Sequence, residues 1–230
     1  MFAPPRLLVG LGNPGREYEA TRHNAGFWFA DALVRALGVG FSPEPRFHGD
    51  TARFGNRLRL LKPTTHMNGS GRSVGALARF FAIEPGEIVV VHDELDLPAG
   101  EVRLKLSGGI AGHNGLRDIR TVLATSAFWR LRIGIGHPRD SDIPQQQVVD
   151  YVLKPPRPDE LRAIREAVDR AVAAWPHIAA GDFERARTAL HTRPVEPERG
   201  SPPRPGGAAP AGGAQGGAAG GQPAPGGERA

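Results

Sequence analysis

Two kinds of hydrophobic pattern alternate along most of the chain. In segments such as Ala25 to Leu37 (AGFWFADALVRAL), apolar residues recur every three or four positions, which predicts amphipathic helices. Short apolar runs lie between these segments and predict strands. The alternation is typical of an α/β domain in which helices cover both faces of a sheet. We expect strands over Arg6 to Gly10, Arg57 to Leu61, Glu87 to His92, Val102 to Leu106 and Trp129 to Gly136, and further helices over Ser70 to Phe81, Leu116 to Leu123 and Leu161 to Trp175.

The C-terminal segment from Pro194 to Ala230 has a different composition. It is rich in Gly, Pro and Ala, and it has almost no large apolar side chains to offset the entropy that is lost when a chain becomes ordered. We therefore expect one folded domain over residues 1–193 and a disordered tail over residues 194–230. A Gly/Pro-rich recognition segment is the weaker alternative for this tail.

Composition narrows the class of protein. With 230 residues, of which 40% are hydrophobic, the chain is long enough for one sizeable core. Its 29 Lys and Arg outnumber its 24 Asp and Glu, a mild excess that favours a polyanionic partner. The absence of cysteine excludes disulfides, thiolate zinc sites and cysteine nucleophiles. Because no apolar run approaches the roughly 20 residues that span a bilayer, we expect no membrane association and a cytoplasmic location.

The loop after the first predicted strand contains three glycines with the spacing of a dinucleotide-binding motif. Gly10, Gly12 and Gly15 match the pattern G-x-G-x-x-G. In that motif the helix opens at the glycines, so that its N-terminus meets the pyrophosphate. Here Pro14 interrupts the glycines and the next helix is expected only near Asn24. Dinucleotide binding is therefore the weaker interpretation of this loop.

The same loop carries polar side chains that suit a binding or catalytic site. Asn13, Tyr18, Arg22, His23 and Asn24 provide donors, an aromatic face and one group that titrates near neutrality. Each also has a structural explanation, since Asn13 suits a turn, Asn24 suits a helix N-cap and Tyr18 can pack beneath the loop. Taken alone, His23 fits a structural role better than a catalytic one.

Four longer motifs follow one another along the chain: GLGNPGREYEATRHNAG, KPTTHMNGSG, VVHDELDLPAG and GHNGLRDI. In this order and spacing they resemble the signature segments of the bacterial peptidyl-tRNA hydrolase family. The likeness runs from about Leu7 to Leu190 and includes the later segment RLRIGIGHP. It implies a monomeric single domain with a mixed, mostly parallel twisted sheet, no metal and no cofactor. The implied activity is hydrolysis of the ester between a peptide and the 3′ end of tRNA, so peptidyl-tRNA is the expected partner.

The resemblance also implies roles for individual residues. It makes His23 the general base that activates water and Asp93 the carboxylate that orients this base. Ester hydrolysis needs such a pair, together with donors for the oxyanion, and a histidine with a pKa of about 6.5 can accept a proton at cellular pH. The amides of Asn68 and Asn114 suit the peptide backbone and the oxyanion, and which of them faces the oxyanion stays open. The family's catalytic positions fall on His23, Asp93 and Asn114, and its substrate contacts fall on Asn13, Tyr18, Met67, Asn68 and Asn114.

Cations outside this centre are candidates for contacts with the RNA. By resemblance, Lys105 and Arg132 form a pair that binds the 5′ phosphate of tRNA. Arg103, Arg117 and Arg130 are expected to add nonspecific attraction, which weakens steeply with salt.

The chain departs from the usual family pattern at two places. His66 stands where members commonly have Phe, and Ile110-Ala111 replaces His-Gly in the glycine-rich loop before Asn114. We expect this loop to gate the site, so these changes bear on its shape and mobility more than on the type of reaction. The segment Asp142 to Leu153 matches a lid-like helix of the family.

Two alternatives to a metal-free hydrolase remain open. The first is a metal site built on the acidic residues that follow His92, although turn formation explains Glu94 and Asp96 as well and His92 itself is expected to pack at the strand end. The second is an RNA-binding module that has lost hydrolysis, which the intact candidate residues disfavour. The metal ligands would be Asp93, Glu94 and Asp96, with His92, His23 or His113.

Overall fold

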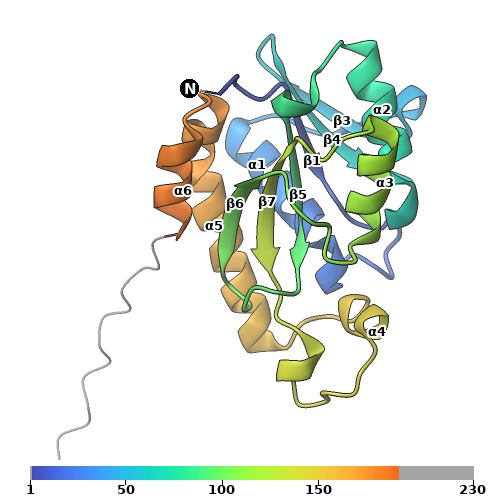
Figure 1. Ribbon diagram of the computed structural model, residues 1–230, viewed down its shortest axis with the longest axis vertical. Coiled ribbons are helices and arrows are strands. Elements are labelled where there is room, and N and C mark those ends of the chain that lie inside the picture. Colours follow the sequence, from blue (N-terminus) through green and yellow to red (C-terminus); the bar gives the residue numbers. More distant parts are fainter. Residues whose placement is uncertain (1, 192–230) are drawn as a thin grey trace, which may run out of the picture. The chain divides into compact units, whose positions relative to one another are not determined.

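A seven-stranded mixed sheet forms the centre of the fold. The computed structural model describes residues 2–191 of the chain (Figure 1). In sheet order the strands are β2 (Ser42–Glu44), β3 (Gly49–Phe54), β4 (Leu58–Pro63), β1 (Leu7–Gly10), β5 (Ile88–Glu94), β7 (Trp129–Gly134) and β6 (Val102–Leu106). The adjacent strands β4, β1, β5 and β7 are parallel, and β3 and β6 run in the opposite direction on either side of them. The predicted mixed, mostly parallel sheet is confirmed.

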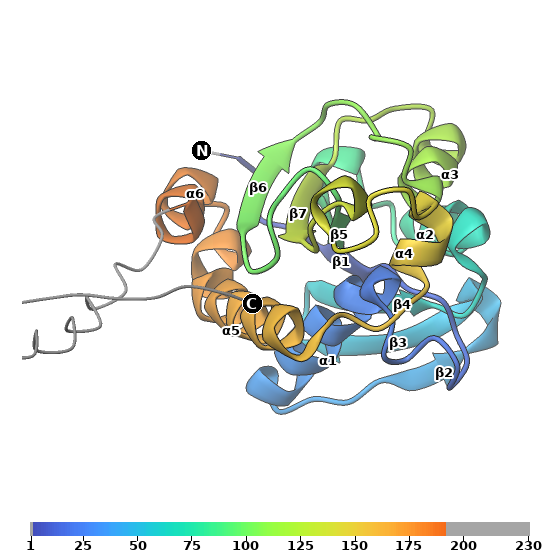
Figure 2. The same cartoon turned by 90° about the horizontal axis from the view of Figure 1, so that it is seen from below.

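Helices cover both faces of this sheet, as predicted (Figure 2). On one face lie α1 (Ala25–Leu37), α5 (Pro158–Ala179) and α6 (Phe183–His191). On the other face lie α2 (Ser70–Phe80) and α3 (Asn114–Leu123). The short helix α4 (Val148–Val152) lies beyond the C-terminal ends of β5 and β7 (Figure 1).

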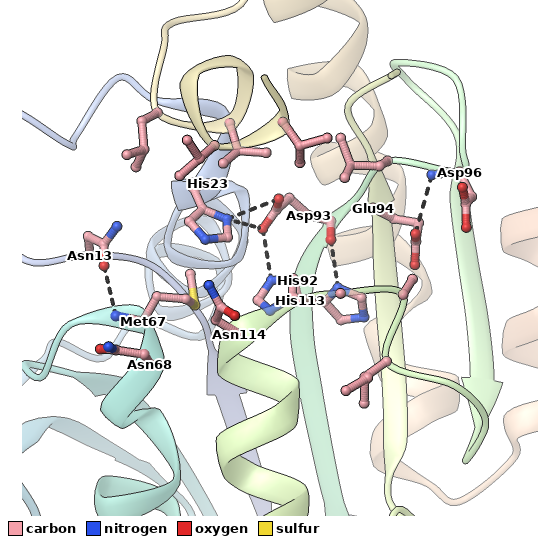
Figure 3. A pocket seen from close by; sticks show the side chains of 18 of the residues that line it. Asn13, His23, Met67, Asn68, His92, Asp93, Glu94, Asp96, His113 and Asn114 are labelled. Atoms are coloured by element: carbon pink, nitrogen blue, oxygen red, sulfur yellow. Dashed lines mark hydrogen bonds and ion pairs between the residues drawn. The ribbon is translucent and has the colours of Figure 1, made fainter. Parts of the chain in front are cut away.

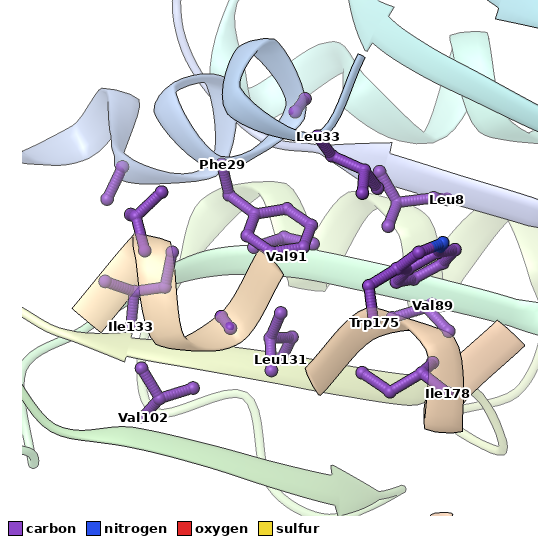
Figure 4. Close-up of a cluster of buried hydrophobic side chains, with 14 of the residues drawn as sticks. Leu8, Phe29, Leu33, Val89, Val91, Val102, Leu131, Ile133, Trp175 and Ile178 are labelled. Atoms are coloured by element: carbon purple, nitrogen blue, oxygen red, sulfur yellow. The ribbon is translucent and has the colours of Figure 1, made fainter. Parts of the chain in front are cut away.

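Two hydrophobic clusters join the helices to the sheet. Leu8 of β1 packs with Phe29 and Trp175 in the first cluster (Figure 4), whereas Leu7 and Val9 belong to the second cluster, beneath α2 and α3. The division follows from the strand, whose successive side chains point to opposite faces. Because β5 lies between helices on both faces, all of its residues are buried, which explains its continuous apolar run.

The predicted strands and helices are all present, with ends that differ by a few residues, but one further expectation is wrong. Of the lid-like helix expected over Asp142 to Leu153, only Val148–Val152 is helical. The residues before α4 are mostly exposed and include Pro144, so they have neither an apolar face to bury nor a complete set of amide donors.

The sequence pattern did not predict β2, β3 and α6. Along β3 only Gly49 and Ala52 are buried, so the strand carries almost no apolar alternation. The tail expected over residues 194–230 lies outside the described residues. Among the described helices, none is long and apolar enough to cross a membrane.

Two glycines let α1 approach the sheet at the point where β1 ends. A Cβ on Gly26 would stand 2.5 Å from the backbone nitrogen of Leu11 and would also meet the backbone oxygen of Val91. A Cβ on Gly10 would stand 2.5 Å from the backbone oxygen of Gly26. Gly10 therefore serves helix packing, and α1 begins only at Ala25, so the glycine loop does not open a helix as a dinucleotide-binding loop does.

We predict that Gly26→Ala destabilises the protein by roughly 1–3 kcal/mol or more, because the new methyl group meets backbone atoms that cannot rotate away. The free energy of unfolding from denaturant titration checks this. Gly40→Ala is the matched control, since a Cβ there meets no atom within 4 Å, and its stability should stay close to that of the wild type. Equal stability of the two variants would contradict the close approach.

Candidate active site

His23 and Asp93 meet at the C-terminal edge of the parallel strands. His23 lies in the short helical turn Arg22–Asn24 that leads into α1, and Asp93 is near the end of β5. The Nδ1 atom of His23 is 2.9 Å from Oδ1 and 3.1 Å from Oδ2 of Asp93 (Figure 3). Both residues are buried. The structure thus brings together the pair predicted from two motifs 70 positions apart.

The environment of this pair determines its protonation. Burial alone would lower the pKa of His23, but the charge of Asp93 and the hydrogen bond to it outweigh burial and raise this pKa above 6.5. Burial opposes the charge of Asp93, yet His23 and His113 hold the pKa of its carboxyl well below the ordinary value. Ionised Asp93 accepts the proton of Nδ1, which leaves the Nε2 lone pair of neutral His23 available as a base.

A second histidine completes the surroundings of Asp93. The Nε2 atom of His113 is 3.1 Å from Oδ1 of Asp93. Its Nδ1 atom accepts a hydrogen bond of 3.4 Å from the backbone nitrogen of Leu116, so His113 is the N-cap of α3 and its proton lies on Nε2. Sequence reasoning considered His113 only as a metal ligand. Its place directly before a helix was the available signal for a capping residue that also reaches the site.

His92 packs at the strand end, as expected. It is 1% exposed, and its Nδ1 atom is 2.6 Å from the backbone oxygen of Asp93. Burial and the nearby His113 lower the pKa of His92 to about 3, so it is neutral near pH 7. This histidine holds the backbone of Asp93 by a hydrogen bond and does not take up a proton at physiological pH.

The structure reduces the predicted metal-binding cluster to three residues. Among the described residues, His23, Asp93 and His113 have possible ligand atoms within 4.8 Å of one another. These atoms are joined by hydrogen bonds through Asp93, which a metal ion would have to replace. Glu94 instead binds Arg132, with Nε 2.7 Å from Oε2, and Asp96 is exposed, so the six-residue cluster considered from the sequence is not assembled.

Asn13 connects the first loop to the loop that carries Met67. Its Oδ1 atom accepts a hydrogen bond of 2.8 Å from the backbone nitrogen of Met67. Its backbone is held by Asn24, whose Oδ1 accepts from the nitrogen of Asn13 at 2.9 Å and whose Nδ2 donates to the oxygen of Asn13 at 3.0 Å. Asn24 stands at the N-cap position of α1, but its side chain makes no capping hydrogen bond and bridges the loop instead.

A pocket of about 630 Å³ opens in front of these residues. Asn68 and Asn114 are exposed where they line this pocket, and Met67, which also lines it, is buried. Figure 3 shows all three below His23 in that view. The Oδ1 atom of Asn114 accepts a hydrogen bond of 3.0 Å from Nη1 of Arg117. The lining residues at the centre of the pocket are Asn13, His23, Met67, Asn68, Asp93, His113 and Asn114, and α4 adds Val148, Val149 and Val152.

The other predicted contacts lie outside this pocket. Tyr18 is half-buried, and its ring centroid is 6.3 Å from that of His66, which does line the pocket. Lys105 is exposed on β6, and Arg132 is half-buried on β7. Because Arg103 pairs with Arg132 and Lys105 with Arg130, the four cations alternate with core residues and share one face of the sheet.

One of these cations is not available to RNA. Arg130 is 3% exposed, and its guanidinium donates to the backbone oxygens of Gly109, at 2.5 Å, and of Ser107. The expected nonspecific role of Arg130 is therefore wrong, because this side chain is buried beneath the loop that it holds. Arg103 is also engaged, with Nη2 3.0 Å from Oε2 of Glu101.

Comparison with known proteins identifies the family. The family model described as peptidyl-tRNA hydrolase matches residues 7–198. The chain belongs to the peptidyl-tRNA hydrolase family. The peptidyl-tRNA hydrolase of Aromatoleum aromaticum is 58% identical over 194 residues, which are 84% of this chain and 97% of that protein. The one from Azoarcus is 56% identical over 194 residues, 84% of this chain and 87% of its own length.

Solved structures agree with this assignment. The crystal structure of peptidyl-tRNA hydrolase from Acinetobacter baumannii has a TM-score of 0.77 and 42% sequence identity. The match covers 83% of this chain and 96% of that one. The chain is therefore an enzyme of the hydrolase class, with the fold of peptidyl-tRNA hydrolases.

The two departures from the usual family sequence have visible consequences. Ala111 adopts a φ of 44° and Ser107 a φ of 60°, a left-handed conformation that glycine adopts more readily. Ile110 packs against the second hydrophobic cluster while it also lines the pocket. The hydrogen bonds of Arg130 and the packing of Ile110 attach this loop to the rest of the fold. His66 is exposed at the pocket wall beside Tyr18.

We predict that Asp93→Asn lowers the pKa of His23, because burial lowers this pKa and the substitution removes the negative charge that, together with the hydrogen bond, outweighs burial. In the wild type, His23 should lose its proton at a pH above 6.5; in the variant the transition should move to lower pH. NMR titration of the histidine ring signals measures both. The signals of His191, on α6, provide the internal control and should not shift. An unchanged titration of His23 would contradict the assigned coupling.

Proposed function

We propose that this protein hydrolyses the ester bond of peptidyl-tRNA, with His23 as the general base. The observation that carries the proposal is the buried hydrogen bond between His23 and Asp93 at the floor of the pocket. It leaves one ring nitrogen of neutral His23 free to accept a proton from water. Membership in the peptidyl-tRNA hydrolase family supports this choice of substrate.

The reaction follows from this geometry. Neutral His23 takes a proton from water through Nε2 while the water oxygen attacks the ester carbonyl. Asp93 stabilises the imidazolium that forms and keeps the ring in its orientation. When the tetrahedral intermediate collapses, the bond between the carbonyl carbon and the ribose oxygen breaks. That oxygen receives the proton from His23, so the free peptide and the tRNA leave and the base is restored.

The hydrogen bonds of the asparagines indicate which of their amide groups can bind the substrate. Arg117 donates to Oδ1 of Asn114, and the backbone nitrogen of Met67 donates to Oδ1 of Asn13. With their oxygens occupied, both residues have N–H groups left for the substrate, which suits an oxyanion or a peptide carbonyl. Asn68, which lines the pocket next to Met67 and is exposed, can turn either end of its amide to the peptide backbone. We assign oxyanion stabilisation to Asn114 and peptide binding to Asn68 and Asn13, with Met67 and Tyr18 packing against the substrate.

The tRNA would be held by cations on the open face of β6 and β7. Arg132 is fixed by Glu94 through Nε, so its two terminal nitrogens can form a fork toward a phosphate. Lys105 lies on the same sheet face one diagonal position away and is exposed. We assign the 5′ phosphate of tRNA to this pair. The proposal includes no metal, no cofactor and no second copy of the chain.

We predict that His23→Ala lowers kcat for peptidyl-tRNA by about 100- to 10,000-fold, the usual contribution of a general base. Release of peptide from purified peptidyl-tRNA, measured in EDTA, tests both the base and the absence of a metal. The control is His177→Ala, a half-buried histidine of α5, which should keep normal turnover. Binding without turnover by the wild type would favour the RNA-binding alternative, and loss of wild-type activity in EDTA would favour the metal at His23, Asp93 and His113.

A second prediction concerns the proposed phosphate pair. Lys105→Ala should raise KM about tenfold for tRNA with a 5′ phosphate, the effect of one lost charge-assisted hydrogen bond, and leave kcat nearly unchanged. The same variant should show no penalty with substrate that has a 5′ hydroxyl. Arg120→Ala, which removes an exposed cation from α3, is the control. Equal penalties with both substrates would assign Lys105 to nonspecific attraction.

A further inference from the structure

Arg22, the neighbour of His23, makes an unusual number of buried contacts for a cation. Its Nη1 donates to the backbone oxygens of Tyr151 at 3.2 Å, Lys154 at 3.2 Å and Pro155 at 3.0 Å. Its Nη2 is 2.7 Å from Oε2 of Glu160. The side chain is 7% exposed, so neither the ion pair nor the hydrogen bonds face bulk water.

The three carbonyls belong to the C-terminal end of α4 and the residues after it. A helix of five residues cannot satisfy its last carbonyls internally and is too short to be stable by itself. Arg22 satisfies these acceptors and places a positive charge at the negative end of the helix. The guanidinium carbon also lies 4.0 Å from the centroid of the Tyr151 ring, whose hydroxyl donates to Ile135 at 2.8 Å.

The segment that Arg22 holds forms a wall of the active-site pocket. Val149 is 58% exposed and Val148 is 42% exposed, and both line the pocket, as does Leu153. Most residues between Asp140 and Val149 are exposed, so the connection from β7 offers this wall little support. Figure 2 shows α4 in front of the strand ends, and Figure 3 shows its segment, in yellow, across the pocket from Asn68 and Asn114.

The backbone of the same turn reinforces the link. The nitrogen of Arg22 donates to the oxygen of Lys154 at 3.2 Å, so two donors of one residue bind the end of the wall. Because Arg22 and His23 share a single helical turn, the position of the wall is tied to that of the base.

We propose that Arg22 is a positioning residue for peptidyl-tRNA hydrolysis, one that anchors α4 as the apolar wall against which the peptide part of the substrate is bound. The inference rests on the proposed function for its substrate, but the anchoring itself can be measured without one. Arg22 touches neither the water nor the ester, and it acts through the position of Val148, Val149 and Leu153.

The alternative is that Arg22 and Glu160 form a purely structural ion pair. A buried ion pair can often be replaced by apolar side chains of similar size without loss of stability. The three carbonyls distinguish the two interpretations, because an apolar replacement removes the side-chain donor from all of them. Only the backbone donors to Tyr151 and Lys154 would then remain, which loosens the end of α4. A structural ion pair would affect unfolding alone, whereas an anchor affects the affinity for substrate.

We expect Arg22→Met to raise KM for peptidyl-tRNA about tenfold, as follows if the wall stays in place only about a tenth of the time. The kcat should change much less, and its dependence on pH should stay the same, because His23 and Asp93 are intact. Hydrogen exchange of the free protein should become faster at residues 148–155. Arg22→Lys keeps the charge near Glu160 but has three N–H donors where the guanidinium has five, too few for three carbonyls and Glu160 together. It should lie between Arg22→Met and the wild type.

Arg162→Met is the matched control, since Arg162 is an exposed cation on the same helix as Glu160. If Arg22→Met fails to fold, Arg22→Lys and Glu160→Gln carry the test. A folded Arg22→Met protein with wild-type KM and wild-type exchange at residues 148–155 would overturn the proposal. If exchange becomes faster in Arg22→Met but the wild type does not turn over peptidyl-tRNA, the anchoring role of Arg22 is supported and the proposed function is rejected.

Discussion

The candidate active site depends on one buried negative charge, the carboxylate of Asp93. It lies near the end of the central strand β5, where only 4% of Asp93 is exposed, and His23 and His113 are bound to it. A buried carboxylate of this kind is stable only when partners replace its hydration. The carboxylate in return determines which nitrogen of His23 carries the proton and raises the pKa of that ring. The backbone of Asp93 is supported in turn by neutral His92.

The parallel strands bring the loops of the site to one edge, but side chains fix the loops there. Asn13 accepts from the backbone of Met67, and Asn24 holds the backbone of Asn13. These bonds join segments that lie 54 and 11 positions apart. Gly10 and Gly26 permit the close packing of α1 on β1. This packing fixes how far His23 and Asn24, which directly precede α1, lie from the end of the sheet.

Two buried arginines donate hydrogen bonds to carbonyl groups in the irregular segments around the pocket. Carbonyl groups outside regular structure need donors when they are buried, and arginine has five N–H groups in one planar head. Arg130 binds carbonyls of the glycine-rich loop, and Arg22 binds those at the end of α4. Part of the excess positive charge of the chain is thus used inside the fold. The proposed phosphate pair, Lys105 and Arg132, does not belong to this internal set, since Lys105 is exposed and Arg132 is half-buried.

The sequence by itself determined the class of fold, the main elements and the pair His23 and Asp93. Helix and strand periodicities reflect burial along a single element, and the motif resemblance covers nearly all of the folded domain. Tertiary structure alone decided the rest. Whether Arg130 faces RNA or the core, whether His113 binds Asp93, and where Arg22 points all depend on contacts between distant segments. No local pattern encodes such contacts, because the same arginine or histidine suits a solvated surface equally well until the fold removes it from water.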